Sequence, residues 1–242
     1  MSRIAENYRQ LAERLAECAR RNGRAPDEVK LVGVTKYVGF EQTQELVEAG
    51  CRHLGESRPQ QLCDKAEQAR QLAAEPPLHW HLIGHLQRNK ARRVLQWADW
   101  IHSADSARLL EALSRLTVEL GQTPAPGERD RRPRLLLEVN ISGDAAKHGF
   151  APGDLRDTLL SLDGTPLRIV GLMGMASGEG GVARARRDFA SLRALRDELV
   201  DDCPAGVSLH ELSMGMSGDW EQAVAEGATL IRVGSALFED AE

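Results

Sequence analysis

The 242-residue sequence has few cysteines and no long apolar run, and both absences narrow what the protein can be. Its four cysteines are scattered, with neither C-x-x-C nor zinc-knuckle spacing, which is typical of free thiols in a reducing compartment. No segment approaches the roughly 18 consecutive apolar residues that a membrane-spanning helix needs. The charged N-terminus also lacks the apolar core of a signal peptide. We therefore expect a cytoplasmic protein without a membrane segment.

The sequence has no excess of positive charge. It has 31 lysines and arginines against 36 aspartates and glutamates, and the two signs are mixed along the chain. The formal net charge of −5 argues against a general nucleic-acid or anionic-membrane binder. A small phosphate-bearing ligand is still compatible with this charge, because local donors rather than net charge hold a phosphate.

Three closely spaced histidines lack the neighbours that a metal motif requires. His79 and His81 are two residues apart and would share one face of a strand, with His85 just beyond. No cluster of Cys, Asp or Glu and no H-E-x-x-H pattern accompanies them. We therefore predict no metal site.

The sequence does contain a recurring unit, in which a short apolar run precedes a charged, periodic segment. The apolar runs predict strands, and the segments between them predict helices. Eight such strands alternating with helices favour an α/β protein with a single-domain (β/α)8 TIM barrel over an open doubly wound sheet. An amphipathic helix at residues 3–20 precedes them, so we expect one domain over residues 1–242 with an extra N-terminal helix. The expected strands cover residues 30–35, 52–55, 78–83, 100–103, 134–141, 168–173, 207–212 and 229–233.

Lys36 follows the first strand, where a barrel carries its functional residues. A lysine at a strand end is most often solvated, with its aliphatic part lying along apolar surface. The alternative is a neutral amine that attacks an aldehyde and forms a Schiff base. Lys36 alone does not decide between these two interpretations.

Small and hydroxyl-bearing residues follow strands seven and eight, the standard phosphate-binding position of a barrel. These segments have the sequences LSMGMSG and IRVGS. Gly215 and Gly234 would let the backbone approach a phosphate closely, and hydroxyl donors are available on Ser213, Ser217 and Ser235. Two ordinary Gly/Ser turns are the alternative, but the position of both turns favours a phosphate site.

Arg232 lies within the apolar run of strand eight, between Leu230 and Val233. A charge buried there requires a nearby partner or a ligand. A structural ion pair inside the barrel and a contact to a bound ligand are both compatible with the sequence.

Ordered motifs over about residues 30–238 give the chain a closer likeness: VGVTK, LGES…Q, HLIGHLQRNK, VNIS…K.G, GLMGM, LSMGMSGDWEQAVAEGAT and IRVGSALF. In these motifs it closely resembles the pyridoxal phosphate homeostasis proteins, single-domain barrels related to the N-terminal domain of alanine racemase. The resemblance implies a barrel of the pyridoxal-phosphate fold type III and pyridoxal 5′-phosphate as the cofactor. It also implies a role in keeping intracellular cofactor and passing it to apo-enzymes, rather than robust catalytic turnover.

The resemblance also implies roles for individual residues. Lys36 would form the internal aldimine, and Arg232 would face the pyridine nitrogen, keeping it unprotonated because two positive partners repel. Ser57 stands where the family usually has Asn, so its polar contact to the cofactor is expected to be shorter or bridged by water. The residues implied around the phosphate are Ser213, Met214, Gly215, Ser217, Gly234 and Ser235.

Two other functions compete with cofactor holding. A racemase or decarboxylase of this fold needs an acid–base group on each face of the substrate adduct, and the family's racemases take the second, a tyrosine, from a second domain that this sequence lacks. The chain has only Tyr8, on the first helix, and Tyr37, whose side chain should point opposite to that of Lys36. A Schiff-base aldolase acting on a phosphosugar would also use a lysine and a phosphate site, but the motifs match the pyridoxal family more closely.

The sequence leaves the assembly and a second cofactor site open. No long apolar surface stripe requires a partner, so we expect a monomer. A second pyridoxal molecule, held by free thiols or by a second lysine (Lys90 or Lys147), is left open by the sequence.

Overall fold

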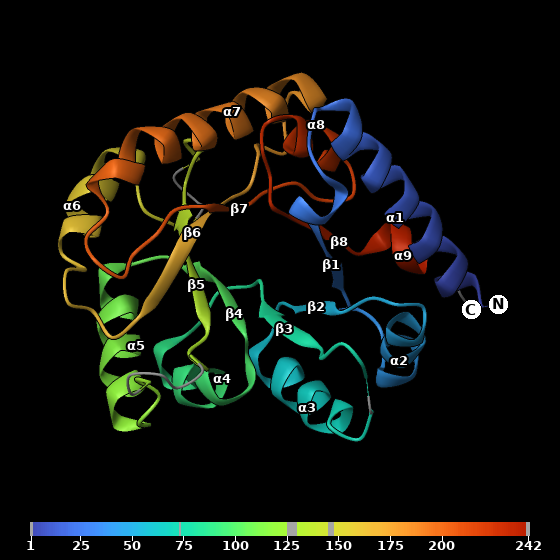
Figure 1. The fold of residues 1–242 in the computed structure, drawn as a ribbon, viewed down its shortest axis with the longest axis horizontal. Coiled ribbons are helices and arrows are strands. Elements are labelled where there is room, and N and C mark those ends of the chain that lie inside the picture. The colour runs from blue at the N-terminus through green and yellow to red at the C-terminus, as the bar shows by residue number, and fades with distance from the viewer. Residues whose placement is uncertain (1, 73, 125–129, 145–147, 241–242) are drawn as a thin grey trace.

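The computed structural model describes residues 2–72, 74–124, 130–144 and 148–240, and its centre is a closed barrel of eight parallel strands (Figure 1). The strands follow one another around the barrel in chain order, and the last pairs with the first. The predicted (β/α)8 barrel is therefore confirmed. The strands are β1 (Lys30–Val34), β2 (His53–Glu56), β3 (His79–Leu82), β4 (Trp100–Ala104), β5 (Arg134–Val139), β6 (Arg168–Gly174), β7 (Glu211–Ser213) and β8 (Leu230–Val233).

Strand seven differs most from its predicted position. The apolar run at residues 207–212 predicts a strand there, but β7 begins only at Glu211. Val207 closes a turn on the carbonyl of Pro204, with an N···O distance of 3.1 Å, so the start of the apolar run belongs to a turn. Apolar character alone does not distinguish a buried turn from the strand that it enters.

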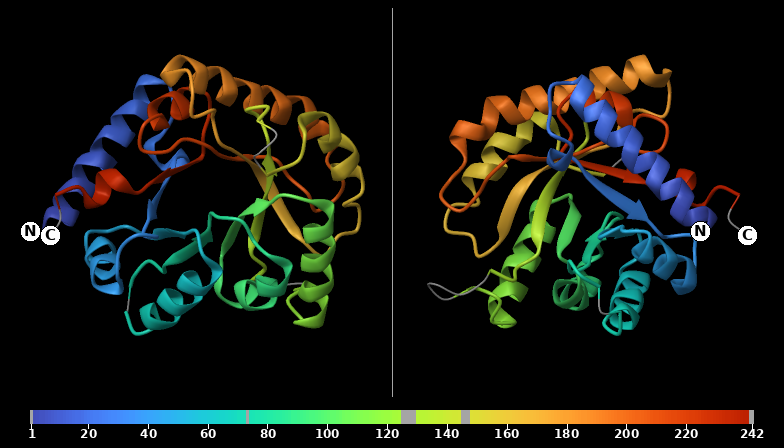
Figure 2. Two further views of the ribbon diagram at one scale, coloured as in Figure 1. Left: turned by 180° about the vertical axis from the view of Figure 1, so that it is seen from behind. Right: turned by 45° about the vertical axis from the view of Figure 1, so that its right-hand side comes forward.

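Helices form the outer layer around the barrel (Figures 1 and 2). Strands covered in this way are buried on both faces, which explains their continuous apolar runs. Among the described helices, none combines the length and apolar character needed to cross a membrane. The helices are α1 (Arg3–Arg21), α2 (Phe40–Glu48), α3 (Pro59–Ala69), α4 (Ala91–Trp97), α5 (Ala107–Glu119), α6 (Leu155–Leu160), α7 (Gly181–Leu199), α8 (Trp220–Ala225) and α9 (Ser235–Phe238), with 3-10 turns η1 (Pro26–Glu28), η2 (Arg88–Lys90), η3 (Pro152–Asp154) and η4 (Val200–Asp202).

The predicted N-terminal helix covers the outside of the barrel where β8 pairs with β1. Ser2 caps α1, and Ile4, Leu11, Leu15 and Cys18 form its buried stripe. The helix packs against α2, α8 and α9. The four-residue α9 is too short to cover β8 by itself, so α1 completes the outer layer there.

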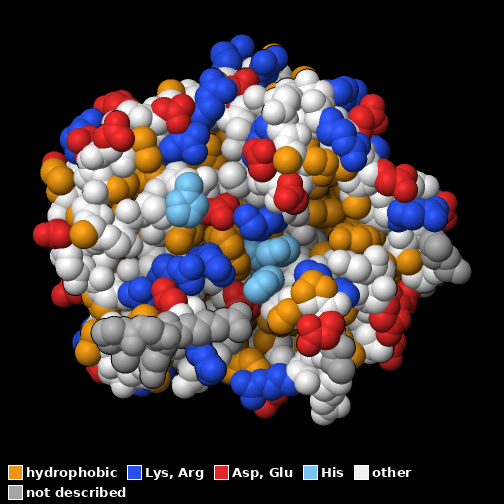
Figure 3. Space-filling view, in the orientation of Figure 1, with side chains coloured by type: hydrophobic (Ala, Val, Ile, Leu, Met, Phe, Trp, Pro, Cys, Tyr) orange, Lys and Arg blue, Asp and Glu red, His pale blue; other side chains and the backbone are white. Residues whose placement is uncertain are grey.

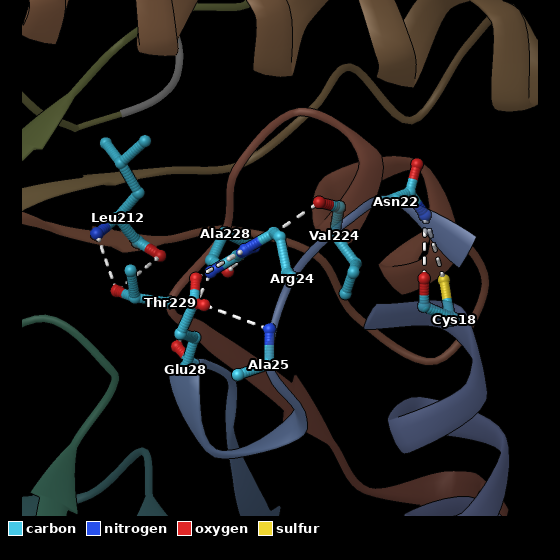
Figure 4. Close-up of polar contacts among 9 residues, drawn as sticks. All are labelled: Cys18, Asn22, Arg24, Ala25, Glu28, Leu212, Val224, Ala228 and Thr229. Atoms are coloured by element: carbon cyan, nitrogen blue, oxygen red, sulfur yellow. Dashed lines mark hydrogen bonds and ion pairs between the residues drawn. The ribbon is translucent and has the colours of Figure 1, made fainter. Parts of the chain in front are cut away.

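Polar contacts tie the segment after α1 to α8 and to the chain that leads into β8 (Figure 4). The Arg24 guanidinium donates to the carbonyl oxygen of Ala228 at 2.6 Å and to that of Val224 at 3.4 Å. The hydroxyl of Thr229 accepts the backbone N–H of Leu212 at 2.8 Å. These bonds support the junction of β7 and β8, where Ser213 lies opposite Leu230.

Charged and histidine side chains gather over the middle of the barrel on the face seen in Figure 3. Several strands begin with a charged residue, and Lys30 pairs with Glu211 at 3.2 Å across the starts of β1 and β7. Arg168, at the start of β6, pairs with Asp130 at 3.5 Å. The amino-terminal end of a barrel contributes to stability, whereas reactions take place at the other end.

Candidate functional site

Lys36 lies in the turn directly after β1 and is half-buried. Its Nζ is 4.8 Å from the centroid of the Tyr37 ring, which is 89% exposed. The prediction that Tyr37 points opposite to Lys36 is therefore wrong. Residues 36 and 37 form a turn, and side chains alternate between faces only in a strand.

A buried ion pair lies beneath the turn that carries Lys36. Lys65 of α3 contacts Glu56 Oε1 at 2.6 Å and donates to the carbonyl oxygens of Thr35 at 2.8 Å and Val38 at 2.9 Å. The Thr35 hydroxyl donates to the same Glu56 oxygen at 2.7 Å. Lys65 thus fixes the backbone on both sides of Lys36.

The sequence analysis missed Lys65, although α3 carries a signal for it. The buried stripe of this helix consists of Leu62, Cys63, Ala66 and Ala69, and Lys65 lies within it. A charged residue on the apolar face of a helix requires a buried partner, and here Glu56 supplies it.

The turns after β7 and β8 meet at the end of β1. Gly215 has φ +91°, and a Cβ on it would lie 2.5 Å from the Cβ of Ala223, so a glycine is required there. The backbone N–H of Gly234 donates to the Ser217 hydroxyl at 3.4 Å and joins the two turns. A Cβ on Gly234 would lie 3.2 Å from the carbonyl oxygen of Val34. Because Gly215 and Gly234 have no side chains, the turns after β7 and β8 can pack beside the turn that carries Lys36.

The carboxyl ends of the strands and the turns that follow them form the rim of the barrel. The other residues predicted for the site differ in how they face this rim. Ser213 and Met214 are fully buried, and the backbone N–H of Met214 donates to Leu230 within the barrel at 3.1 Å. Ser235 is exposed at the start of α9, next to Gly234. Ser57 is half-buried at the end of β2, the strand that pairs with β1.

Arg232 is buried inside the barrel without an ion pair among the described residues. It is 5% exposed, and its guanidinium donates to the Ser213 hydroxyl and to the carbonyl oxygen of Gly174, the latter at 3.3 Å. Burial lowers the pKa of Arg232 to about 10, with Asp219 and Glu138 opposing the shift, so the side chain stays charged at neutral pH. Of the two interpretations that the sequence leaves open, the part of the chain that the structure describes shows no ion pair for Arg232, and its guanidinium donates to the neutral oxygens of Ser213 and Gly174.

A chain of hydrogen bonds runs from Arg232 across the barrel. The Ser213 hydroxyl lies 2.8 Å from His102 Nδ1, and the ring nitrogens of His102 and His81 and of His81 and His53 are each 2.9 Å apart. Burial holds the pKa values of His102 and His81 well below the usual range, helped by Arg232 and by neighbouring imidazoles, so both rings are neutral. A neutral imidazole has one donor and one acceptor nitrogen, so the bonds through these rings all run in one direction.

A second polar group lies at the ends of β3, β4 and β5. His85 Nδ1 is 2.8 Å from Asp105 Oδ2, and the His148 ring stacks on the His85 ring with centroids 4.5 Å apart. Glu138 is 6% exposed, and burial followed by the charge of Asp105 raises its pKa to about 7. The sequence analysis missed His148 and Glu138 because they are far from His85 in the chain. Lys90 is exposed in η2, and Lys147 lies outside the described residues.

Together, the fold and the rim define a class of protein: a parallel barrel with a lysine after β1, glycine–serine turns after β7 and β8, and a buried arginine on β8. The model for the N-terminal domain of alanine racemase matches residues 1–242, and the chain belongs to this family. A pyridoxal phosphate homeostasis protein of Pseudomonas aeruginosa is 39% identical over 241 residues, covering 98% of this chain and 96% of its relative. The pyridoxal phosphate homeostasis protein of Escherichia coli K12 is 31% identical over 249 residues, with 98% and 97% covered. These relatives place the chain in the pyridoxal phosphate homeostasis group of the family.

Solved structures give the same fold. PipY of Synechococcus elongatus PCC7942, with pyridoxal phosphate bound, matches with a TM-score of 0.81 and 40% identity, covering 97% of this chain and 99% of PipY. The alanine racemase of Bartonella henselae, with covalently bound pyridoxal phosphate, matches with a TM-score of 0.68 and 15% identity. This chain spans 59% of that enzyme's length, and the likeness concerns the fold alone.

Proposed function

We propose that the protein binds pyridoxal 5′-phosphate at the rim, as one domain over residues 1–242, and keeps it for delivery to apo-enzymes inside the cell. The observation that carries this function is the arrangement of Lys36, the turn at Gly234 and the buried Arg232 around one end of the barrel. The cofactor has its aldehyde and its phosphate arm on adjacent ring carbons, with the ring nitrogen farther away. An amine beside a glycine–serine turn, with a cation deeper in the barrel, suits that layout.

The lysine supplies the covalent bond in this proposal. The Lys36 amine attacks the aldehyde carbon, water leaves, and the resulting aldimine holds the cofactor. Strands β1 and β8 are neighbours, with Gly33 opposite Val233, so the lysine turn and the Gly234 turn are adjacent. The bonds from Lys65 to the carbonyls of Thr35 and Val38 keep the lysine turn in place.

The turns after β7 and β8 receive the phosphate. The Ser217 and Ser235 hydroxyls are the donors, and Gly215 lets the first turn fold tightly. The backbone N–H of Gly234 donates to the Ser217 hydroxyl, which leaves the proton of that hydroxyl for the phosphate. Met214 lies buried behind that turn, and Ser57 follows β2, where its hydroxyl would reach the cofactor by a shorter contact or through water. Ser213 acts through Arg232, because its hydroxyl already accepts a bond from the guanidinium.

Arg232 favours holding over turnover. When bound, pyridoxal phosphate withdraws electrons from a substrate carbanion, and it does so best with a protonated ring nitrogen. A permanently charged donor beside that nitrogen keeps it unprotonated, since two positive groups repel. Arg232 fits this role because it is charged at neutral pH and has no carboxylate paired with it among the described residues.

The two tyrosines give no second acid–base group for a racemase. Tyr8 lies on α1, outside the barrel, and burial raises its pKa to about 12. The Tyr37 ring lies beside the Lys36 amine rather than opposite it. A racemase needs its two groups on opposite faces of the substrate adduct.

Borohydride reduction followed by peptide mass spectrometry tests this function. The purified protein, loaded with pyridoxal phosphate, is expected to carry the reduced adduct on Lys36 and to show the visible absorbance band of an aldimine. The Lys36→Ala variant should lose both signals, whereas Lys90→Ala, which removes an exposed lysine, should keep them. An adduct on another lysine in the wild-type protein would contradict the proposed anchor.

A second measurement separates holding from turnover. The loaded protein is incubated with D- and L-amino acids in deuterated water, and exchange at Cα is followed by NMR. We expect no enzyme-dependent exchange. Exchange accompanied by loss of chirality would instead establish the racemase alternative.

A further inference from the structure

The polar group at the ends of β3, β4 and β5 has the composition of a metal site. One ligand atom each from His85, Asp105 and His148 lies within 4.8 Å of the other two. We propose that these three side chains bind one divalent transition-metal ion, of which Zn²⁺ is the natural probe, through two imidazole nitrogens and one carboxylate oxygen. None of the three belongs to the cofactor contacts proposed above.

The carboxylate and the first histidine are held in position. Asp105 Oδ2 lies 2.8 Å from His85 Nδ1, and the Ser106 hydroxyl donates to the other carboxylate oxygen at 3.0 Å. The Ser103 hydroxyl donates at 2.7 Å to the carbonyl oxygen of Gly84, the residue before His85. The ends of β3 and β4 are thus tied together, so these two groups need little reordering to bind an ion.

The two residues that follow the second histidine are held against the end of β5. Gly149 has φ +110°, and a Cβ on it would lie 2.9 Å from the carbonyl oxygen of Glu138. Phe150 donates to that same carbonyl at 2.8 Å and accepts from the backbone N–H of Asn140 at 3.0 Å. Gly149 and Phe150, which directly follow His148, are therefore attached to the end of β5. The rings of His148 and His85 are within 19° of parallel.

The donor set determines which ions fit. Imidazole nitrogens suit Zn²⁺, Co²⁺ and Ni²⁺, whereas Mg²⁺ and Ca²⁺ prefer oxygen ligands throughout. Among the ion pairs of the described residues, Asp105 pairs only with His85, so no lysine or arginine neutralises it. Two neutral imidazoles and one carboxylate carry a single negative charge that a divalent cation compensates.

The surroundings leave a coordination position open. The side chain of His85 is 46% exposed and that of Asp105 is 7% exposed, so the ion would have a buried side and a side facing solvent. Three protein ligands with a water in the fourth position is the usual arrangement of a zinc site that binds a further ligand. An exchangeable water at the mouth of the barrel would be replaced by an anionic ligand such as a carboxylate.

The partners of His85 in the folded chain differ from its neighbours in the sequence, which explains why the sequence predicts no metal site. The sequence analysis grouped His85 with His79 and His81, but His81 bonds to other histidines inside the barrel and His79 stacks on His53 with centroids 4.9 Å apart. The partners of His85 follow two other strands, and only the closed barrel brings them to it.

Metal titration of the full-length protein tests the site. After treatment with a chelator, the protein is titrated with ZnCl₂ by calorimetry and with CoCl₂ by visible absorption. We expect one ion per chain and Co²⁺ bands typical of nitrogen and oxygen ligands. His148→Ala and Asp105→Asn should each weaken binding by at least about tenfold, since even loss of a residue that only orients a ligand has an effect of that size.

Two control variants make the result specific. His210→Ala removes another exposed histidine and should leave the affinity unchanged. Lys36→Ala should also bind Zn²⁺ normally, so failure of the cofactor proposal would not affect this test. His148 is exposed, so its replacement should leave the fold intact. Equal Zn²⁺ affinity in the wild-type protein and His148→Ala, or an equal loss in His210→Ala, would overturn the proposal.

Discussion

Lys65 and Glu56 form a buried ion pair, with Nζ and Oε1 2.6 Å apart, directly beneath the turn that carries Lys36. The side chain of Lys65 is 10% exposed and that of Glu56 is fully buried, so solvent screens this pair weakly. The same ammonium binds the carbonyl oxygens of Thr35 and Val38. The pair therefore couples the stability of the barrel to the position of the proposed anchor lysine.

Replacing Lys65 by Met should destabilise the protein by about 3–5 kcal/mol, because it leaves the Glu56 carboxylate buried without a partner. Urea unfolding measures this change. The double variant Lys65→Met with Glu56→Gln should recover part of the loss, since the unpaired charge is gone. Equal stability of Lys65→Met and the wild-type protein would show that the pair contributes nothing.

The three histidines of the internal chain should make the protein less stable in mild acid. Their pKa values are lowered, that of His53 to about 4 and those of His81 and His102 well below the usual range, with burial as the first cause. A lowered folded-state pKa means that the unfolded chain binds more protons, so stability is present above pH ~6.5 and is lost as the pH falls below it. Urea unfolding of the wild-type protein and of His53→Gln at pH 7 and pH 5 measures this. The variant should lose less stability between the two pH values, and an identical loss would contradict the assignment.

Glu138 should act in the opposite direction. Burial and the charge of Asp105 raise its pKa to about 7, so the folded state binds more protons than the unfolded chain. The contribution of Glu138 is therefore fully present below pH ~4.5 and is lost as the pH rises through 7, by at most about 3 kcal/mol. Glu138→Gln should be more stable than the wild-type protein at pH 8, with a smaller difference at pH 5. The same difference at both pH values would contradict the raised pKa.

Gly234→Ala should weaken cofactor binding more than it affects the fold. The added Cβ would lie 3.2 Å from the Val34 carbonyl oxygen and push the turn away from β1. We expect roughly a tenfold higher dissociation constant for pyridoxal phosphate, comparable to losing one hydrogen bond to a charged group. Gly218→Ala is the matched control, because its Cβ would meet nothing within 4 Å in the neighbouring turn. Equal dissociation constants for the two variants would show that Gly234 is not close to the phosphate.

The sequence by itself determined the barrel and the location of the rim. Apolar runs and helical periodicity are short-range patterns, and eight repeats of them leave few architectures that bury every strand on both faces. The position of Lys36 after the first strand and of Gly215 and Gly234 after the last two followed from the same order of elements. Once the strands are parallel, their carboxyl ends must lie at one end of the barrel.

Only the tertiary structure decided which side chains touch. Lys65 lies beneath the Lys36 turn, Ser213 joins Arg232 to His102, and His148 stacks on His85, although each pair is distant in the chain. Counting residues along a strand does not give such contacts, because the register between β4 and β5 shifts between Ile101 and Ala104. A shift of one residue reverses which face a side chain occupies. The stagger of the closed barrel therefore determines the contacts of its interior, and local sequence does not encode that stagger.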